Sequence, residues 1–113
     1  SGPMTGLKDN NHPLFDRATA YLRRKGFVVV NPAENFAGSL DVPRHVLMRM
    51  DISNLLQCSR IVLLPGWEIS VGARLEVQIA EELKLDFYTI VPFEDEFKLT
   101  EITYEDLFNV EFN

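Results

Sequence analysis

The chain has 113 residues, of which 46% are hydrophobic and 25% are charged, and its net charge is −6. These are ordinary values for a globular protein, and they exclude a disordered or collagen-like chain. The length suits a single domain spanning residues 1–113, and the single cysteine excludes an internal disulfide. With only two histidines, we expect no metal site.

Acidic residues are concentrated toward the C-terminus. Residues 1–80 carry nine Lys and Arg against seven Asp and Glu, whereas residues 81–113 carry two against ten. Because the acidic part repels phosphate backbones, we expect no nucleic-acid partner. The longest purely apolar run is Ile61–Leu64, which is too short for a membrane span, and no signal-peptide pattern opens the chain. We therefore expect a cytoplasmic protein without a membrane partner.

The first elements expected are a loop, a helix and a strand. Glycine and proline make residues 1–6 a loop, and a helix begins around Asn10–Pro13, where proline suits the first turn. Gly26 is expected to end this helix, since glycine readily takes the left-handed conformation that follows a helix. Phe27–Val30 is short, apolar and β-branched, which predicts a buried strand that ends at Asn31–Pro32.

The rest of the chain repeats this alternation. Apolar residues at helical spacing predict two further helices, and two short apolar runs that end at proline predict buried strands. We expect a loop at residues 33–43, a helix from Pro43 or Arg44 to about Cys58, a strand at Arg60–Leu64, a helix after Gly72, a strand at Asp86–Val91 and a short helix around Tyr104–Phe108.

Strands that are apolar on both faces and alternate with helices indicate an α/β protein, with a parallel sheet covered by helices on both faces. In such a fold each helix follows a strand, so the loop at residues 1–6 suggests that a first strand precedes Ser1. The alternative is that Ser1–Pro3 is partly a cloning remnant.

The most informative stretch runs from Pro65 to Glu76, where a strand ends and a helix begins. Ligands of open α/β sheets bind outside the carboxyl ends of the strands, so a site is expected here. Gly72 lets a ligand approach the backbone, and Ser70 offers a hydroxyl beside helix N–H groups. Trp67 either stacks on a planar base or packs as a local plug.

Glu76 and Asp51 are the candidate catalytic residues. Glu76 lies one turn into its helix on a mostly apolar stripe, and the positive helix end favours the ionised carboxylate that a nucleophile needs. Asp51 interrupts an amphipathic helix, and two carboxylates on neighbouring helices can divide attack on a sugar carbon from assistance to the leaving group. Structural alternatives remain for both. Glu76 could cap its helix or pair with Arg74 or Lys84, and Asp51 could pair with Arg49 or Arg44.

Three segments, in this order and spacing, carry a family resemblance: Ser1–Gly6, Asp51–Val62 and Ser70–Glu76. Together they resemble the nucleoside 2-deoxyribosyltransferase superfamily, in the branch grouped as domain of unknown function 4406. Deoxynucleoside 5′-monophosphate N-glycosidases belong to the same superfamily. The resemblance covers about residues 1–92.

The resemblance implies a flavodoxin-like or Rossmann-like parallel sheet and cleavage of the N-glycosidic bond of a small nucleoside or nucleotide. It assigns the nucleophile to Glu76 and assistance of the departing base to Asp51. It also assigns phosphate contact to Ser70 and the glycine of the first loop to Gly2, and we expect Pro3 and Met4 of the same loop to bind substrate. The family's active-site tyrosine would lie two residues before Ser1. The hydrolases carry a serine and an arginine for phosphate where this chain has Pro3 and Thr5.

No metal or redox cofactor is expected, because a carboxylate can itself stabilise the sugar cation. The resemblance also implies a homo-oligomer, a dimer or larger, with sites near the subunit interfaces. The acidic and aromatic segment at 93–113 has apolar residues to bury in such an interface. The alternative function is a non-catalytic nucleotide-binding or interaction module on the same fold, because a fold does not fix a function.

Overall fold

The structure is a computed structural model, and it describes residues 1–4, 7–34 and 42–108. Its regular elements follow one another as helices and strands, with short 3₁₀ turns at Lys8–Asn11, Trp67–Ile69 and Glu105–Phe108. In chain order they are α1 (His12–Arg24), α2 (Arg44–Leu55), β1 (Arg60–Leu63), α3 (Val71–Glu82), β2 (Asp86–Phe93) and β3 (Glu96–Ile102).

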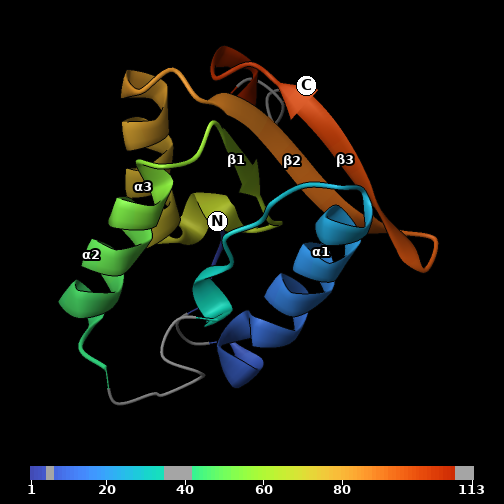
Figure 1. Cartoon of the computed structure of the whole chain (residues 1–113), viewed down its shortest axis with the longest axis horizontal. Coiled ribbons are helices and arrows are strands. Elements are labelled where there is room, and N and C mark those ends of the chain that lie inside the picture. Colours follow the sequence, from blue (N-terminus) through green and yellow to red (C-terminus); the bar gives the residue numbers. More distant parts are fainter. Residues whose placement is uncertain (5–6, 35–41, 109–113) are drawn as a thin grey trace.

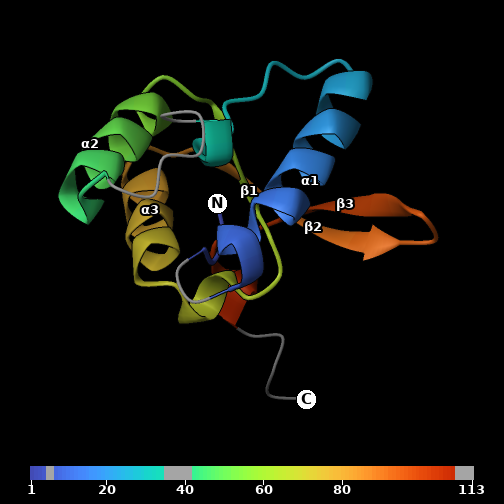
Figure 2. The ribbon, with the colours of Figure 1, turned by 90° about the horizontal axis from the view of Figure 1, so that it is seen from below.

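The three strands form one sheet in the order β1-β2-β3, with helices on both sides (Figures 1 and 2). Alternate side chains of a strand point to opposite faces, and the core accordingly divides in two. On one face Leu63 and Phe87 pack with Val77 of α3, and α2 lies beside α3. On the other face Leu64 and Ile90 pack against α1.

The expected strands at Arg60–Leu64 and Asp86–Val91 are confirmed as β1 and β2, which pair in parallel. The expectation of a purely parallel sheet is wrong, because β3 pairs antiparallel to β2. Glu94 and Asp95 connect them with φ of 44° and 57°, which suits the tight turn of a two-residue hairpin. The sheet is therefore mixed.

Pro92 does not end the second strand, contrary to the expectation from the sequence. The Asp86 N–H donates to the Ser59 carbonyl beside β1 at 3.1 Å, so by alternation the backbone groups of Tyr88 and Pro92 face the same side. The pairing of β1 with β2 ends at Thr89, so the N–H that proline lacks falls beyond the end of β1. Pro92 pairs with Phe97 of β3 on its other side, and β2 continues to Phe93.

The expected strand at Phe27–Val30 is also corrected, because this segment belongs to no strand. Within the described part of the chain, the hydrogen bonds of its backbone go to α1. The Phe27 N–H donates to the Leu22 carbonyl at 3.2 Å, and the Arg23 guanidinium donates to the Val29 carbonyl at 2.9 Å. Arg23 also binds both carboxylate oxygens of Glu34. The apolar pattern predicts extended backbone, but a strand also needs a partner on its other edge.

Both ends of α1 lie where the sequence predicts them, whereas α2 ends earlier than predicted. α1 starts at His12 with Pro13 in its first turn, and Gly26 beyond its end has φ of 96°, both as expected. α2 starts at Arg44 but ends at Leu55, one turn before Cys58. The short helix expected near Tyr104–Phe108 is a 3₁₀ turn at Glu105–Phe108. Within the described residues, no helix is both long and apolar enough to cross a membrane.

Candidate active site

Glu76 lies on the face of α3 that is turned inward, with 9% of its surface exposed. The helix begins at Val71, two residues earlier than expected from the sequence, because the Ser70 hydroxyl caps it by accepting from the Ala73 N–H at 3.2 Å. The Glu76 carboxylate accepts a hydrogen bond from the Ser1 hydroxyl at 2.9 Å. Among the ion pairs of the described residues, Lys84 pairs with Glu81 and none involves Glu76.

Ser1 connects this carboxylate to the edge of the sheet. Its nitrogen donates to the Val62 carbonyl at 2.6 Å, and its carbonyl accepts from the Leu64 N–H at 2.8 Å. Burial lowers the pKa of the Ser1 α-amino group, and the negative charges of Glu76 and Asp51 oppose that shift. The negative charges of both candidate carboxylates therefore influence the same buried α-amino group.

A groove of about 620 Å³ brings the two candidate catalytic residues onto one surface. This β1-edge groove is lined by α1, the segment Gly26–Pro32, the end of α2 through Ser59, the edge of β1, Ser1 and Glu76. Asp51 and Asn54 face it from α2, and Glu76 faces it from α3. The arrangement offers two carboxylates and an amide beside a largely apolar wall.

Cys58 lies on the same groove but is a weak candidate for chemistry. Its thiol donates to the Asn54 carbonyl at 3.3 Å, and burial raises its pKa. Because the thiolate is the reactive form, this environment favours a small, inert side chain.

The other predicted site residues lie near the carboxyl end of β1, and none of them lines the groove. A Cβ added at Gly2 would lie 2.8 Å from the Leu64 Cβ, so the first loop passes very close to the strand. Pro3 is buried, and its ring lies 3.2 Å from a Cβ placed on Gly66. Met4 packs against the cluster on the α1 face.

Gly72 and Trp67 are also enclosed by the protein. A Cβ added at Gly72 would lie 3.3 Å from the Met48 sulfur, so this glycine allows α2 and α3 to approach. The Trp67 ring is 6% exposed in the core and packs edge-on against Phe108, with ring centroids 6.1 Å apart. Its packing is that of a local plug, one of the two alternatives the sequence leaves open.

Sequence reasoning did not find the contact between Ser1 and Glu76. It depends on pairing of the first residue with β1, and no local pattern in the sequence reveals such a long-range contact. Asn54 carries a weak signal, because it lies on the same helical line as Asp51.

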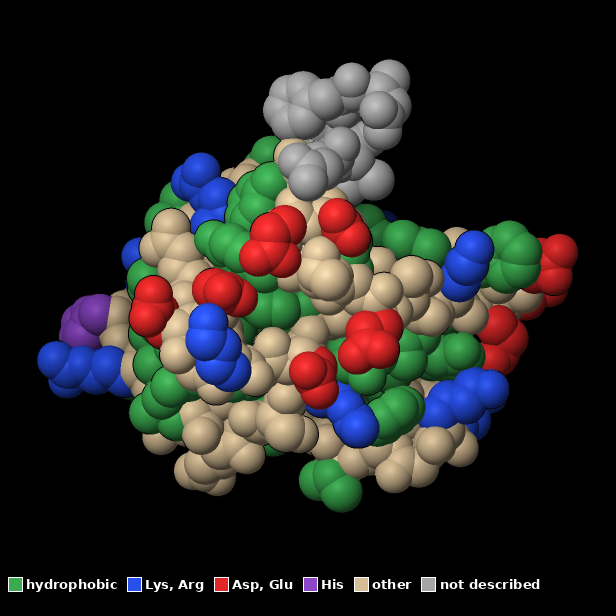
Figure 3. Space-filling model, turned by 90° about the horizontal axis from the view of Figure 1, so that it is seen from above, with side chains coloured by type: hydrophobic (Ala, Val, Ile, Leu, Met, Phe, Trp, Pro, Cys, Tyr) green, Lys and Arg blue, Asp and Glu red, His purple; other side chains and the backbone are tan. Residues whose placement is uncertain are grey.

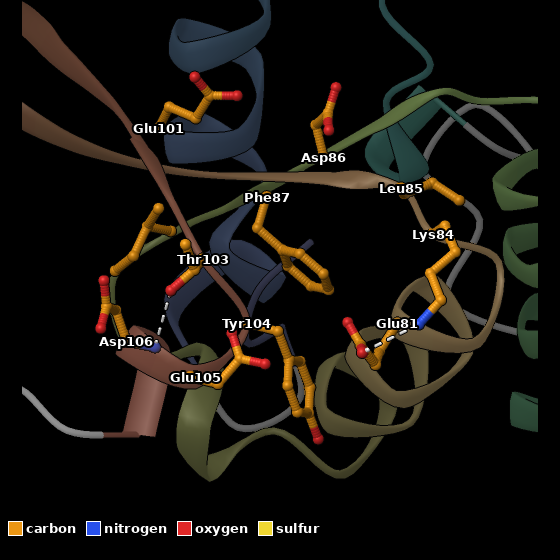
Figure 4. A pocket seen from close by; sticks show the side chains of 11 residues that line it. Glu81, Lys84, Leu85, Asp86, Phe87, Glu101, Thr103, Tyr104, Glu105 and Asp106 are labelled. Carbon is orange, nitrogen blue, oxygen red and sulfur yellow. Dashed lines mark hydrogen bonds and ion pairs between the residues drawn. The ribbon is translucent and has the colours of Figure 1, made fainter.

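A second hollow lies where α3 ends and β2 begins (Figure 4). Its floor includes Phe87 and Tyr104, whose ring centroids are 5.8 Å apart. Its other side chains are mostly acidic: Glu81, Asp86, Glu101, Glu105 and Asp106. Figure 3 shows acidic side chains spread across one face of the molecule. Within the described residues, no group of three or more His, Cys, Asp or Glu side chains is placed to hold a metal ion.

The family model described as Domain of unknown function (DUF4406) matches residues 1–89. The chain belongs to this family. No curated protein and no solved structure matches it. The match spans the first loop, both candidate carboxylates and the first half of β2, whereas the hairpin strand β3 of this DUF4406 domain lies beyond it.

Proposed function

We propose that this DUF4406 domain cleaves or transfers the N-glycosidic bond of a deoxynucleoside or its 5′-monophosphate. The observation that carries the proposal is the meeting of Glu76 and Asp51 on one groove. Glu76 comes from α3 and Asp51 from the neighbouring α2, which supports one carboxylate as nucleophile and the other as the group that assists the leaving base. The resemblance to the nucleoside 2-deoxyribosyltransferase superfamily gives the two residues the same roles.

In the proposed mechanism, a Glu76 carboxylate oxygen attacks C1′ of the sugar. The bond between C1′ and the base nitrogen breaks, its electron pair leaves with the base, and the Asp51 carboxyl group donates the proton that the base takes up. The sugar is then held as an ester of Glu76. Water or a second base attacks C1′, the Glu76 carboxylate leaves, and Asp51 accepts the proton of the attacking group.

Ser1 supports this chemistry as a positioning residue. Its hydroxyl donates to one Glu76 oxygen at 2.9 Å, which restricts the rotation of the carboxylate and leaves the second oxygen for C1′. The proposal needs no metal or redox cofactor, since the carboxylate itself stabilises the cationic sugar. Phosphate contact by Ser70 and the first-loop role of Gly2 belong to the proposal as the resemblance implies them. Substrate contacts by Pro3, Met4 and Gly72 belong to it as expectations from the sequence.

The wider context is part of the same proposal: a flavodoxin-like sheet, a homo-oligomer and a cytoplasmic location. Exposed apolar residues of the hairpin and the segment that follows support self-association. Phe93 and Phe108 are 54% and 45% exposed. Phe97 and Leu99 instead pack on α1 within the chain, and Phe112 lies outside the described residues.

One observation favours the second candidate, a non-catalytic nucleotide-binding or interaction module. Glu76 already accepts a hydrogen bond from Ser1, so the carboxylate has a structural role in holding the first loop. A carboxylate kept only for that purpose would be replaceable by an amide without loss of any activity.

Incubation with a panel of deoxynucleosides and their 5′-monophosphates tests the proposal. We expect release of free base, and a second base added as acceptor separates transfer from hydrolysis. Release of no base from any substrate would contradict the proposed activity. Binding of the same nucleotides without release, measured by calorimetry, would establish the non-catalytic module in its place.

A further inference from the structure

The outer edge of β3 is a strand edge with no described neighbour (Figure 1). Asp86 directs its backbone groups toward β1, so by alternation Phe87 directs its own toward β3, where it pairs with Ile102. Along β3, the backbone groups of alternate residues therefore face away from β2, and these residues are Phe97, Leu99 and Glu101. Among the described residues, none of these outward groups has a hydrogen-bond partner. The edge thus offers its N–H and C=O groups to an added strand.

The charged residues of this edge differ between its two ends. At the hairpin end, Glu96 pairs with Arg24 at 3.1 Å. At the other end, Glu101 is exposed and forms no ion pair among the described residues. Glu101 also lines the second hollow, so the edge of β3 leads directly into that hollow. An added strand would therefore meet an uncompensated negative charge at the Glu101 end and not at the hairpin end.

The second hollow adds three more carboxylates around its aromatic floor. All three are exposed, and none belongs to an ion pair of the described residues: Asp86, Glu105 and Asp106. Figure 4 shows acidic side chains on both sides of the Phe87 ring. Lys84 lines the hollow too, but it pairs with Glu81 at 3.5 Å. Like charges gathered around one hollow repel one another, and a cationic group placed among them would relieve that repulsion.

A second copy of the chain does not suit this edge. In an antiparallel pair of two β3 strands, the hairpin turn of one copy would lie beside the segment after β3 of the other. The acidic pair Glu94 and Asp95 would then approach the acidic pair Glu105 and Asp106, and facing like charges are destabilising. Within the described residues the carboxylates are not placed to hold a metal ion either. The charge of the edge therefore selects a basic partner.

We propose that the free edge of β3 and the second hollow form one docking surface for an extended, basic segment of a partner protein. The segment adds a strand to β3 through the outward backbone groups. Its side chains beside Phe97 and Leu99 are apolar, and its lysine or arginine side chains lie at the Glu101 end. There they approach the carboxylates of the hollow and the ring of Tyr104. The inference does not depend on the proposed function, because no residue lines both the second hollow and the β1-edge groove.

The test titrates the 113-residue chain into the fluorescein-labelled peptide Arg-Lys-Arg-Thr-Val-Thr-Val. Added antiparallel to β3, this peptide places its valines opposite Phe97 and Leu99 and its third residue, arginine, opposite Glu101. We expect saturable binding by fluorescence anisotropy. At saturation, hydrogen exchange at the outward amides of Phe97, Leu99 and Glu101 should slow by about tenfold or more. The amides of Lys98 and Thr100, which face β2, should change by less.

A matched peptide separates strand pairing from charge. Arg-Lys-Arg-Thr-Pro-Thr-Pro keeps every charge but lacks the two N–H groups that would bind the carbonyls of Phe97 and Leu99. It should bind at least about tenfold more weakly and leave the outward amides unprotected. Equal binding of the two peptides would overturn the proposal, since charge alone would then hold them.

Variants of the protein test the acidic end of the surface. Glu101→Gln combined with Asp106→Asn should weaken binding of the first peptide by about tenfold at low salt. Its thermal midpoint should not fall, because the change removes charges that repel one another, so unfolding cannot explain the loss. Glu82→Gln, on the exposed face of α3 outside the hollow, is the matched control and should bind as the wild type does. Undiminished binding by the double variant, or an equal loss in Glu82→Gln, would contradict the proposal. Protection of the outward amides without peptide that grows with protein concentration would also contradict it, since a second copy would then cover the edge.

Discussion

Replacement of Glu76 by glutamine separates a nucleophile from a structural carboxylate. Glutamine keeps the size of the side chain and its inward position, and its carbonyl oxygen can still accept from the Ser1 hydroxyl. The amide cannot form the sugar ester. We expect base release to fall by at least about a thousandfold, because loss of a covalent nucleophile costs several orders of magnitude in rate.

The structure also sets the expected loss of stability. Glu76→Gln retains the hydrogen bond of 2.9 Å but removes its charge assistance, a difference of about 1 kcal/mol. For a domain of this size, that free energy lowers the thermal midpoint by about 4 °C. The variant should therefore remain folded at the temperature of the assay, and its lost activity cannot be attributed to unfolding.

Glu81→Gln is the matched control on the same helix. Glu81 pairs with Lys84 at 3.5 Å and lines the second hollow, not the β1-edge groove, so the same chemical change there should leave base release unaltered. Release of base is followed by chromatography, with circular dichroism on the same samples. If Glu76→Gln releases base at more than about a tenth of the wild-type rate, the nucleophile assignment is wrong.

Four further outcomes are expected. Asp51→Asn should slow base release by about 10²–10⁴-fold, and less for bases that leave readily, as a comparison of substrates would measure. Gly2→Ala should lower the free energy of unfolding by about 1–3 kcal/mol in denaturant titrations, because its Cβ meets Leu64 at 2.8 Å. Burial lowers the pKa of the Ser1 α-amino group below 8.0, so the unfolded chain binds more protons in the window beneath 8.0. Stability should rise with pH through that window, and thermal melts of N-terminally acetylated protein should lack this rise. Light scattering at tens of micromolar should report a dimer or larger, and a stable monomer of 12.9 kDa would contradict this.

Elements with strong local signals were predicted well. Pro13 and Gly26 mark the ends of α1, and the apolar runs of β1 and β2 are bounded by turn residues. In Phe27–Val30 the local pattern gives extended backbone correctly, yet strand formation depends on a neighbour along its free edge. Such a neighbour is a tertiary property, and local propensity does not contain it.

The hairpin strand β3 had a signal that was missed. Glu96 through Thr100 alternate polar and apolar residues, and the pair Glu94 and Asp95 precedes them as a two-residue turn. Pro92 masked this signal, since a proline usually ends a central strand. Its tolerance follows from the short length of β1, which only the assembled sheet reveals.

The candidate site was predictable only in part. Helical spacing fixes the side of the helix to which a side chain points, but it does not fix which residues lie beside that side chain. The stripe of α3 turns Glu76 inward, and the line of α2 turns Asp51 to the same side. Burial of Trp67 was not decidable from its loop position, since a glycine-containing loop suits an exposed ring and a packed one equally. The contact between Ser1 and Glu76 joins residues 75 positions apart and has no local signature.

Ser1 makes the sheet edge and the candidate catalytic carboxylate interdependent. Its backbone pairs with β1 while its hydroxyl holds Glu76, so any change that orders the edge of β1 also restricts the carboxylate. Because a misplacement of about 1 Å can cost a hundredfold in rate, the order of this sheet edge would act on activity through geometry, without contributing a reacting group.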